Sequence, residues 1–158
     1  MQRLFCVLML SVFVFFFALS QVPPDRDGLL KGEGMGQAKY AEMNGYPGPK
    51  HVLELADKLR LTESERKSIQ AIHDEMSTRA KDLGQRIVDV EEELNNAYKE
   101  GLVSEKSVRD DAEQIGRLRG KLRAVHLKAH LKTKKILTQA QIDLYKKLRQ
   151  SDVPHQHN

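Results

Sequence analysis

The stretch Thr62–Gly101, TESERKSIQAIHDEMSTRAKDLGQRIVDVEEELNNAYKEG, is typical of one long helix. Thr62 and Glu65 have the spacing of a capping box, in which each side chain accepts from the other residue's backbone N–H. Apolar residues then recur at steps of three and four over about eight turns. They are Ile69, Ile72, Met76, Ala80, Leu83, Ile87, Val90, Leu94 and Ala97. Gly101 is a typical C-terminal stop, and Gly84 is the one weak point for helix stability.

A second long helix follows after a tight connection. Ser104 is its N-cap candidate, and an apolar stripe continues to Ile136, so we expect the helix to end near Leu137. Thr138 and Gln141 form another capping-box pattern that opens a last short helix. Upstream, Pro49 suits the first turn of a short helix with its own apolar stripe. No segment shows sustained period-two alternation. The sequence therefore predicts an all-α fold of four helices, built on a long antiparallel hairpin.

Two short helices can cover only one end of such a hairpin. Part of each apolar stripe would stay open to water, which is unfavourable for a soluble domain. We therefore expect a homodimer.

The ends of the chain differ from this helical region, residues 49–150. Arg3, the apolar run Leu4–Leu19 and the triplet Ala18-Leu19-Ser20 are typical of a signal peptide spanning residues 1–20. The alternative is an uncleaved N-terminal anchor, but the run is short for the hydrocarbon core. Residues 21–48 are rich in glycine and proline and are expected to be flexible. Residues 151–158 are expected to form a polar tail.

Composition excludes several function classes. All five phenylalanines and the only cysteine, Cys6, lie in residues 1–20, and the chain has no tryptophan. The processed chain thus has no thiol for a disulfide or a nucleophile, and no Phe or Trp on which nucleic-acid bases stack. Phosphate loops, nucleophile elbows and H-E-x-x-H patterns are absent from the sequence. We expect neither an enzyme nor a nucleic-acid-binding protein.

Two pentapeptides bracket the predicted hairpin. Leu61-Thr62-Glu63-Ser64-Glu65 and Leu137-Thr138-Gln139-Ala140-Gln141 are each Leu-Thr-x-x-(Glu/Gln), and each opens a helix. The second has the LTxxQ form, and Glu65 departs from it in the first. On these motifs residues 50–150, together with the signal peptide, resemble the LTxxQ proteins of the Spy/CpxP superfamily of the bacterial periplasm.

The resemblance implies a periplasmic, cradle-shaped, antiparallel dimer without catalytic activity. Members of that superfamily include ATP-independent chaperones that hold unfolded envelope proteins, inhibitors of membrane sensor kinases, and sensors of zinc, nickel or cobalt. The expected partners are thus unfolded envelope proteins or a membrane sensor kinase. No membrane span is expected after signal cleavage.

Histidines form the first candidate site. His126 and His130 are four residues apart and share one helical face. Hairpin geometry places His73 opposite residue 132, within about a turn of His130. With His51 as a possible fourth ligand, these residues could bind zinc, nickel, cobalt or copper. Neighbouring basic residues oppose a cation, and two histidines four apart also occur by chance on exposed helices.

Basic residues form the second candidate site. The span Gln114–Gln141 has no acidic residue, whereas acidic residues gather between Asp89 and Asp111. The expected client-binding residues are Arg117, Arg119, Arg123, Lys128, Lys132 and Met76. A basic, partly apolar surface attracts acidic or unfolded chains at long range and holds them through apolar contact. A solvated face and the preference of cations for a helix C-terminus explain part of the same pattern.

The sequence thus gives two function hypotheses. The first is an ATP-independent periplasmic chaperone or envelope-stress binding protein, which needs no cofactor. The second is a heavy-metal sensor or resistance protein with a divalent transition metal on its histidines. A purely regulatory partner of a membrane kinase is a third.

Overall fold

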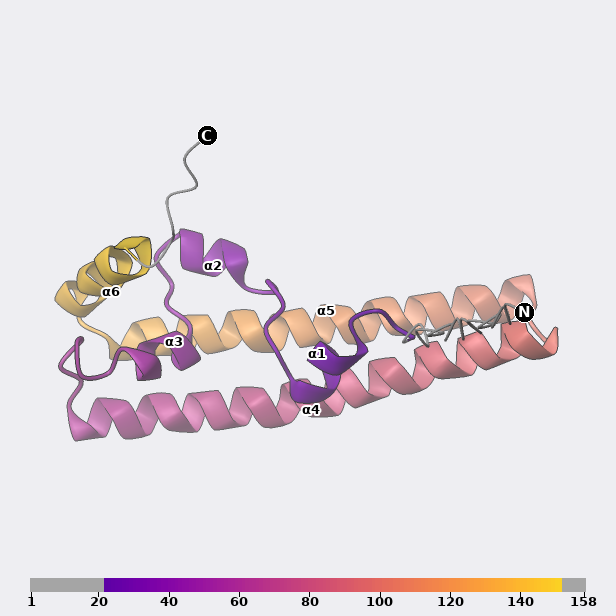
Figure 1. The fold of residues 1–158 in the computed structure, drawn as a ribbon, viewed down its shortest axis with the longest axis horizontal. Coiled ribbons are helices and arrows are strands. Elements are labelled where there is room, and N and C mark those ends of the chain that lie inside the picture. The colour runs from indigo at the N-terminus through magenta and orange to yellow at the C-terminus, as the bar shows by residue number, and fades with distance from the viewer. Residues whose placement is uncertain (1–21, 152–158) are drawn as a thin grey trace, which may run out of the picture.

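A computed structural model describes residues 22–151, which contain six helices and no strand (Figure 1). They are α1 (Arg26–Lys31), α2 (Lys39–Met43), α3 (Pro49–Glu54), α4 (Glu63–Glu100), α5 (Glu105–Ile136) and α6 (Gln139–Ser151). The predicted signal peptide and nearly all of the predicted polar tail lie outside the described residues. Among the described helices, none is both long and apolar enough to cross a membrane.

The two long helices, α4 and α5, form the predicted antiparallel hairpin and run the length of the molecule (Figure 1). The capping box of α4 is present: Glu65 N donates to Thr62 Oγ1 at 3.2 Å, and Thr62 N donates to Glu65 Oε2 at 2.8 Å. Gly101 ends α4 in the left-handed conformation, with φ of 69°. Ser104 caps α5 through a hydrogen bond from Ser107 N. The boundaries of the hairpin are therefore those that the capping pattern predicts.

The second pentapeptide also forms its predicted capping box, and the two boxes touch. Thr138 N donates to Gln141 Oε1 at 2.8 Å, and Gln141 N donates to Thr138 Oγ1 at 3.3 Å. The Gln141 amide also donates from Nε2 to Glu65 Oε2, at 3.3 Å. The hydrogen bond from the Thr62 backbone is the main cause of a lowered pKa at Glu65, and Gln141 adds to it. Glu65 and Gln141 therefore join the first turns of α4 and α6 at the open end of the hairpin.

Apolar side chains form two separate clusters along the hairpin. One cluster, at the open end, joins α3 and α6 to the hairpin through Val52, Leu59, Ile69, Leu137, Ile142 and Tyr145. The other lies further along, between α1, α4 and α5, and contains Leu29, Ala80, Leu83, Ile87, Val88, Val90, Leu118 and Leu122. Short helices thus complete the core on one side of the hairpin. α3 and α6 are its neighbours along the chain, whereas α2 and α3 separate α1 from α4.

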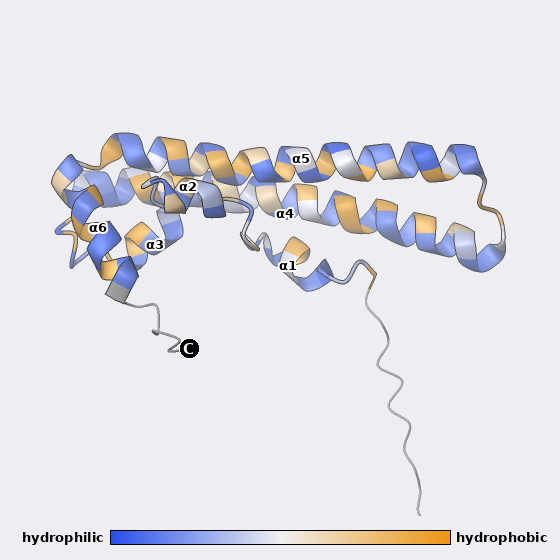
Figure 2. Cartoon of the chain, turned by 90° about the horizontal axis from the view of Figure 1, so that it is seen from above, coloured by the Kyte–Doolittle hydropathy of each residue, from blue (hydrophilic) through white to orange (hydrophobic). Residues whose placement is uncertain are grey.

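Residues 22–48 contain more helix than the sequence predicted. They contain α1 and α2, so the described chain has six helices where the sequence predicted four. In Figure 2, α1, α3 and α6 lie to one side of the hairpin, and α2 lies across it in this view. Glycine and proline do keep these helices short, as expected. Local sequence could not show that Leu29, only 1% exposed, is held by long-range packing against α4 and α5.

Gly84 makes the close approach of α1 possible. A Cβ atom at this position would overlap the carbonyl oxygen and carbon of Leu29. Because that obstacle is backbone, no side-chain rotation could relieve the clash. Gly84 is buried, whereas Gly116 and Gly120 of α5 have open space where a Cβ would stand. The weak point in the helical pattern is therefore a packing site for another helix.

Substitution of these glycines separates helix propensity from packing. Gly120→Ala is expected to raise the free energy of unfolding by up to about 1 kcal/mol, because alanine favours a helix interior. Gly84→Ala should instead release α1 and leave the protein roughly 2 kcal/mol less stable than Gly120→Ala, because Leu29 loses its burial. Urea unfolding measures the difference, and hydrogen exchange at residues 26–31 reports the release. Equal stabilisation by both substitutions would contradict the packing role of Gly84.

Candidate functional site

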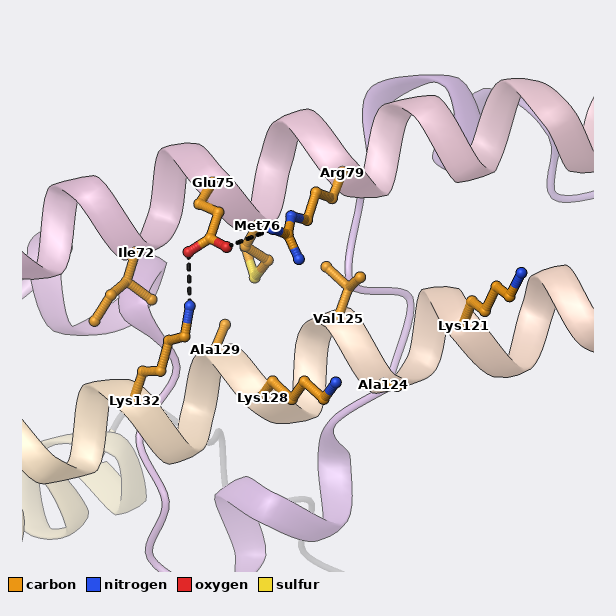
Figure 3. A pocket seen from close by; sticks show the side chains of 10 residues that line it. All are labelled: Ile72, Glu75, Met76, Arg79, Lys121, Ala124, Val125, Lys128, Ala129 and Lys132. Carbon is orange, nitrogen blue, oxygen red and sulfur yellow. Dashed lines mark hydrogen bonds and ion pairs between the residues drawn. The ribbon is translucent and has the colours of Figure 1, made fainter.

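A cleft of about 230 Å³ lies between α4 and α5 (Figure 3). Its apolar lining comes from both helices: Ile72 and Met76 of α4, and Ala124, Val125 and Ala129 of α5. The short helices lie behind the hairpin in this view, so the cleft opens on the face that they leave uncovered (Figure 3). The hairpin therefore offers an accessible apolar surface opposite the N-terminal segment.

Charged side chains surround this apolar lining, and basic ones predominate. They are Arg79, Lys121, Lys128, Lys132 and Glu75. Glu75 binds Lys132 at 2.7 Å and Arg79 at 3.0 Å, and Lys132 is the main cause of a lowered pKa at Glu75. In the part of the chain that the structure describes, neither Lys121 nor Lys128 is in an ion pair. These two ammonium groups remain available to an acidic ligand.

The structure divides the predicted client-binding residues between two faces. Met76, Lys128 and Lys132 line the cleft. Arg119 and Arg123 lie on the other face, where the N-terminal segment engages them. Arg119 donates to both carboxylate oxygens of Asp25, at 2.7 and 3.1 Å, and the Arg123 guanidinium lies 5.8 Å from the centre of the Tyr40 ring.

Arg117, the remaining member of the predicted set, pairs with Glu113 on its own helix at 3.2 Å. The basic run of α5 therefore does not form one surface. Sequence reasoning missed Arg79 and Lys121, which join the cleft. The helical period could have identified both, because Arg79 lies three residues after Met76, and Lys121 lies seven residues, or two helical turns, before Lys128.

The predicted histidines do come together in one cavity. His51, His73, His126 and His130 all line a space of about 700 Å³ between the hairpin and residues 31–51. The predicted hairpin register holds to within two residues, because Lys132, expected opposite His73, contacts Glu75. Met35 and Met76 line the same cavity. It separates the two apolar clusters, which places polar side chains in the middle of the core.

Separate local contacts hold three of these histidines. His130 donates from Nδ1 to the Tyr46 carbonyl at 2.7 Å, and the absence of a side chain at Gly48 leaves room for the His130 ring. His51 lies 3.0 Å from Glu54, and His73 lies 3.3 Å from Asp74. Within residues 22–151 no three His, Cys, Asp or Glu side chains are grouped so that they could hold a metal ion. The donors share a cavity without forming a ligand set.

His126 is the exception among the four. It is 3% exposed, and its Nε2 atom is buried without a hydrogen-bond partner among the described residues. Burial lowers the pKa of His126, and the nearby His130 lowers it further. The imidazole is therefore neutral at pH 7, and its protonation in the folded state is unfavourable.

The stability of the protein is expected to fall in mild acid. Because the pKa of His126 is lower in the folded state, the unfolded chain binds a proton first as the pH drops below about 7. The free energy of unfolding should decrease from pH 7.5 to 5.5, and His126→Gln should reduce that decrease. Urea unfolding at several pH values measures both slopes. Parallel curves for the two proteins would exclude His126 as the source.

Comparison of the chain with protein-family models, with curated proteins and with solved structures finds no match.

Proposed function

We propose that this protein is an ATP-independent periplasmic chaperone that holds unfolded or acidic clients in the cleft between α4 and α5. One observation carries the proposal: an apolar lining from both long helices is surrounded by basic side chains on the uncovered face of the hairpin. The proposed partners are unfolded envelope proteins. A homodimer, and regulation of a membrane sensor kinase, stay predictions.

The chemistry of the cleft suits reversible capture. Lys121 and Lys128 attract acidic segments over several ångströms, and the attraction weakens with salt. Met76, which is unbranched and polarizable, adapts to side chains of different shape. Burial of exposed apolar side chains then supplies affinity without a fixed sequence. Neither step needs ATP, since both are favourable as soon as a client is unfolded.

The first test is suppression of aggregation by the chain that starts at residue 21. Stoichiometric amounts should reduce light scattering by an unfolding substrate protein. Lys121→Glu with Lys128→Glu should weaken suppression several-fold, because two attractive charges become repulsive. Unchanged aggregation at a large excess of the unaltered protein would exclude the function.

A matched control makes the same change of net charge elsewhere. Lys67 and Lys147 are exposed and line neither the cleft nor the histidine cavity. Lys67→Glu with Lys147→Glu should leave suppression near the level of the unaltered protein. Equal loss in both double variants would show that total charge, and not the cleft, holds the client.

Transition-metal binding is the second candidate function, and one observation favours it. All four histidines chosen from the sequence line the same cavity, where His126 Nε2 has no partner among the described residues. Imidazole nitrogens suit zinc, nickel, cobalt and copper. The donor types fit such an ion, but their present arrangement does not, so we propose that binding would require the side chains to regroup.

Calorimetric titration tests this second function. If it is correct, zinc, nickel or copper should bind the unaltered protein at least about tenfold more tightly than His126→Ala with His130→Ala, because two nitrogen donors are lost. His155→Ala with His157→Ala removes two histidines of the C-terminal tail and serves as the control. Equal affinity in the unaltered protein and the His126/His130 variant would exclude the site.

A further inference from the structure

The surface that α1 covers has the features of a peptide-binding site. We call it the α1 docking face and define it by Ala80, Leu83, Gly84 and Ile87 of α4 with Arg119 and Leu122 of α5. It combines an apolar seam between the two helices, a glycine, Gly84, that a helix backbone can approach closely, and a guanidinium, that of Arg119, which binds a carboxylate. It lies on the face opposite the cleft between α4 and α5 (Figures 1 and 3).

The first observation is that α1 depends on this face for its structure. It has only six residues, and a helix of that length is unstable in water by itself. Its N-cap residue, Asp25, makes no side-chain cap hydrogen bond. The Asp25 carboxylate binds Arg119 instead, through two hydrogen bonds of 2.7 and 3.1 Å. Asp25 thus serves recognition between elements in place of capping its own helix.

The second observation is the pairing of an apolar anchor with charged contacts. Leu29 follows Asp25 by four residues, so both lie on one side of α1. Leu29 is 1% exposed, and its carbonyl lies over Gly84. Arg26 binds Glu92 at 3.0 Å, and Glu91 binds Arg119 at 3.3 Å. The α1 docking face, with Glu92 beside it, therefore binds an acidic residue, a basic residue and a leucine at fixed spacing.

The third observation is that a glycine linker and a separate apolar cluster would allow α1 to leave without unfolding the open end of the hairpin. Gly32, Gly34 and Gly36 connect it to α2, and Gly32 and Gly36 have φ of 67° and 75°. The cluster at the open end of the hairpin includes no residue of α1. Short helices with few buried anchors belong to the least stable part of a fold. Release of α1 would expose the seam and free Arg119 from Asp25, while Glu91 would still contact Arg119.

We propose that the α1 docking face is a second guest site, which α1 occupies as an internal competitor. Its guest is a short helical segment with the pattern Asp-Arg-x-x-Leu or a close equivalent. A carboxylate binds Arg119, a leucine enters the seam, and the guest backbone approaches Gly84. A tethered α1 competes at an effective concentration on the order of millimolar, so only abundant or well-matched guests displace it.

The proposal goes beyond the chaperone function, on which it rests only for the identity of natural guests. Its test therefore uses the chain's own segment as the probe: a fluorescent peptide of residues 22–37, VPPDRDGLLKGEGMGQ. The protein begins at residue 21 and contains every described element. Fluorescence anisotropy measures binding of the peptide in trans. This result is independent of aggregation suppression through the cleft.

Three proteins are compared. Asp25→Asn with Leu29→Ala weakens the internal α1, so this variant should bind the peptide at least about tenfold more tightly than the unaltered protein. Addition of Gly84→Ala to that variant should abolish binding, because the new Cβ would overlap the guest backbone. Equal binding to the first two proteins, or binding that survives Gly84→Ala, would overturn the proposal. A peptide with Leu29→Asp should bind none of them.

A measurement on the unaltered protein avoids any effect of substitutions on folding. Excess unlabelled peptide should accelerate hydrogen exchange at residues 26–31 of the protein, because displaced α1 loses its helix. Exchange at residues 80–88 should stay slow, since the guest covers the same surface. Unchanged exchange at residues 26–31 under saturating peptide would show that α1 is not displaced, and would also overturn the proposal.

Discussion

Two helices packed side by side bury only the narrow strip of residues where they meet. The stability of the fold therefore depends on what covers the apolar residues outside that strip. In α4 and α5 the apolar residues extend beyond the mutual contact, as Leu83 and Leu122 show by also packing against Leu29. Short helices cover one side of the hairpin, and the cleft lies on the other (Figures 2 and 3). Because exposed apolar surface is unfavourable, each side has to find a cover. On one side the short helices of the same chain cover the apolar residues. On the cleft side the apolar lining stays accessible to a guest.

The helical period explains why one basic run in α5 serves two faces. Arg119, Arg123, His126 and His130 follow one another at steps of three and four, and all face the N-terminal segment or the histidine cavity. Lys121, Lys128 and Lys132, with Val125, follow at the same steps on the cleft side. Residues two apart point in different directions on a helix. A change of charge at Arg119 therefore affects the attachment of α1, whereas a change at Lys121 affects the cleft.

Sequence alone predicted what depends on local patterns. The boundaries of α4 and α5 depend on Thr62, Ser104 and the Gly101 stop, which act within a few residues of themselves. The meeting of His73 with His126 and His130 followed from hairpin register. The docking of α1 did not, because its anchor contacts a glycine more than fifty residues away, and a glycine in a helix signals weakness unless its partner is known. The division of the basic run was within reach, since the phase of the apolar stripe assigns each basic residue to a side.

His126 and the α1 docking face both lie against the same segment, which is α1 with its glycine linker. His126 lies between the two apolar clusters, close to the Gly34 region of the linker that tethers α1. Protonation of this imidazole requires water or a rearrangement around it, because burial and the nearby His130 make the charge unfavourable. The neighbouring segment is a glycine linker between two short helices, and such segments open at comparatively low cost. Low pH, which charges His126, and a guest that competes for Gly84 would thus both act on α1 and its glycine linker. His126 lies beside Gly34 of the linker, and Gly84 lies beside Leu29 of α1.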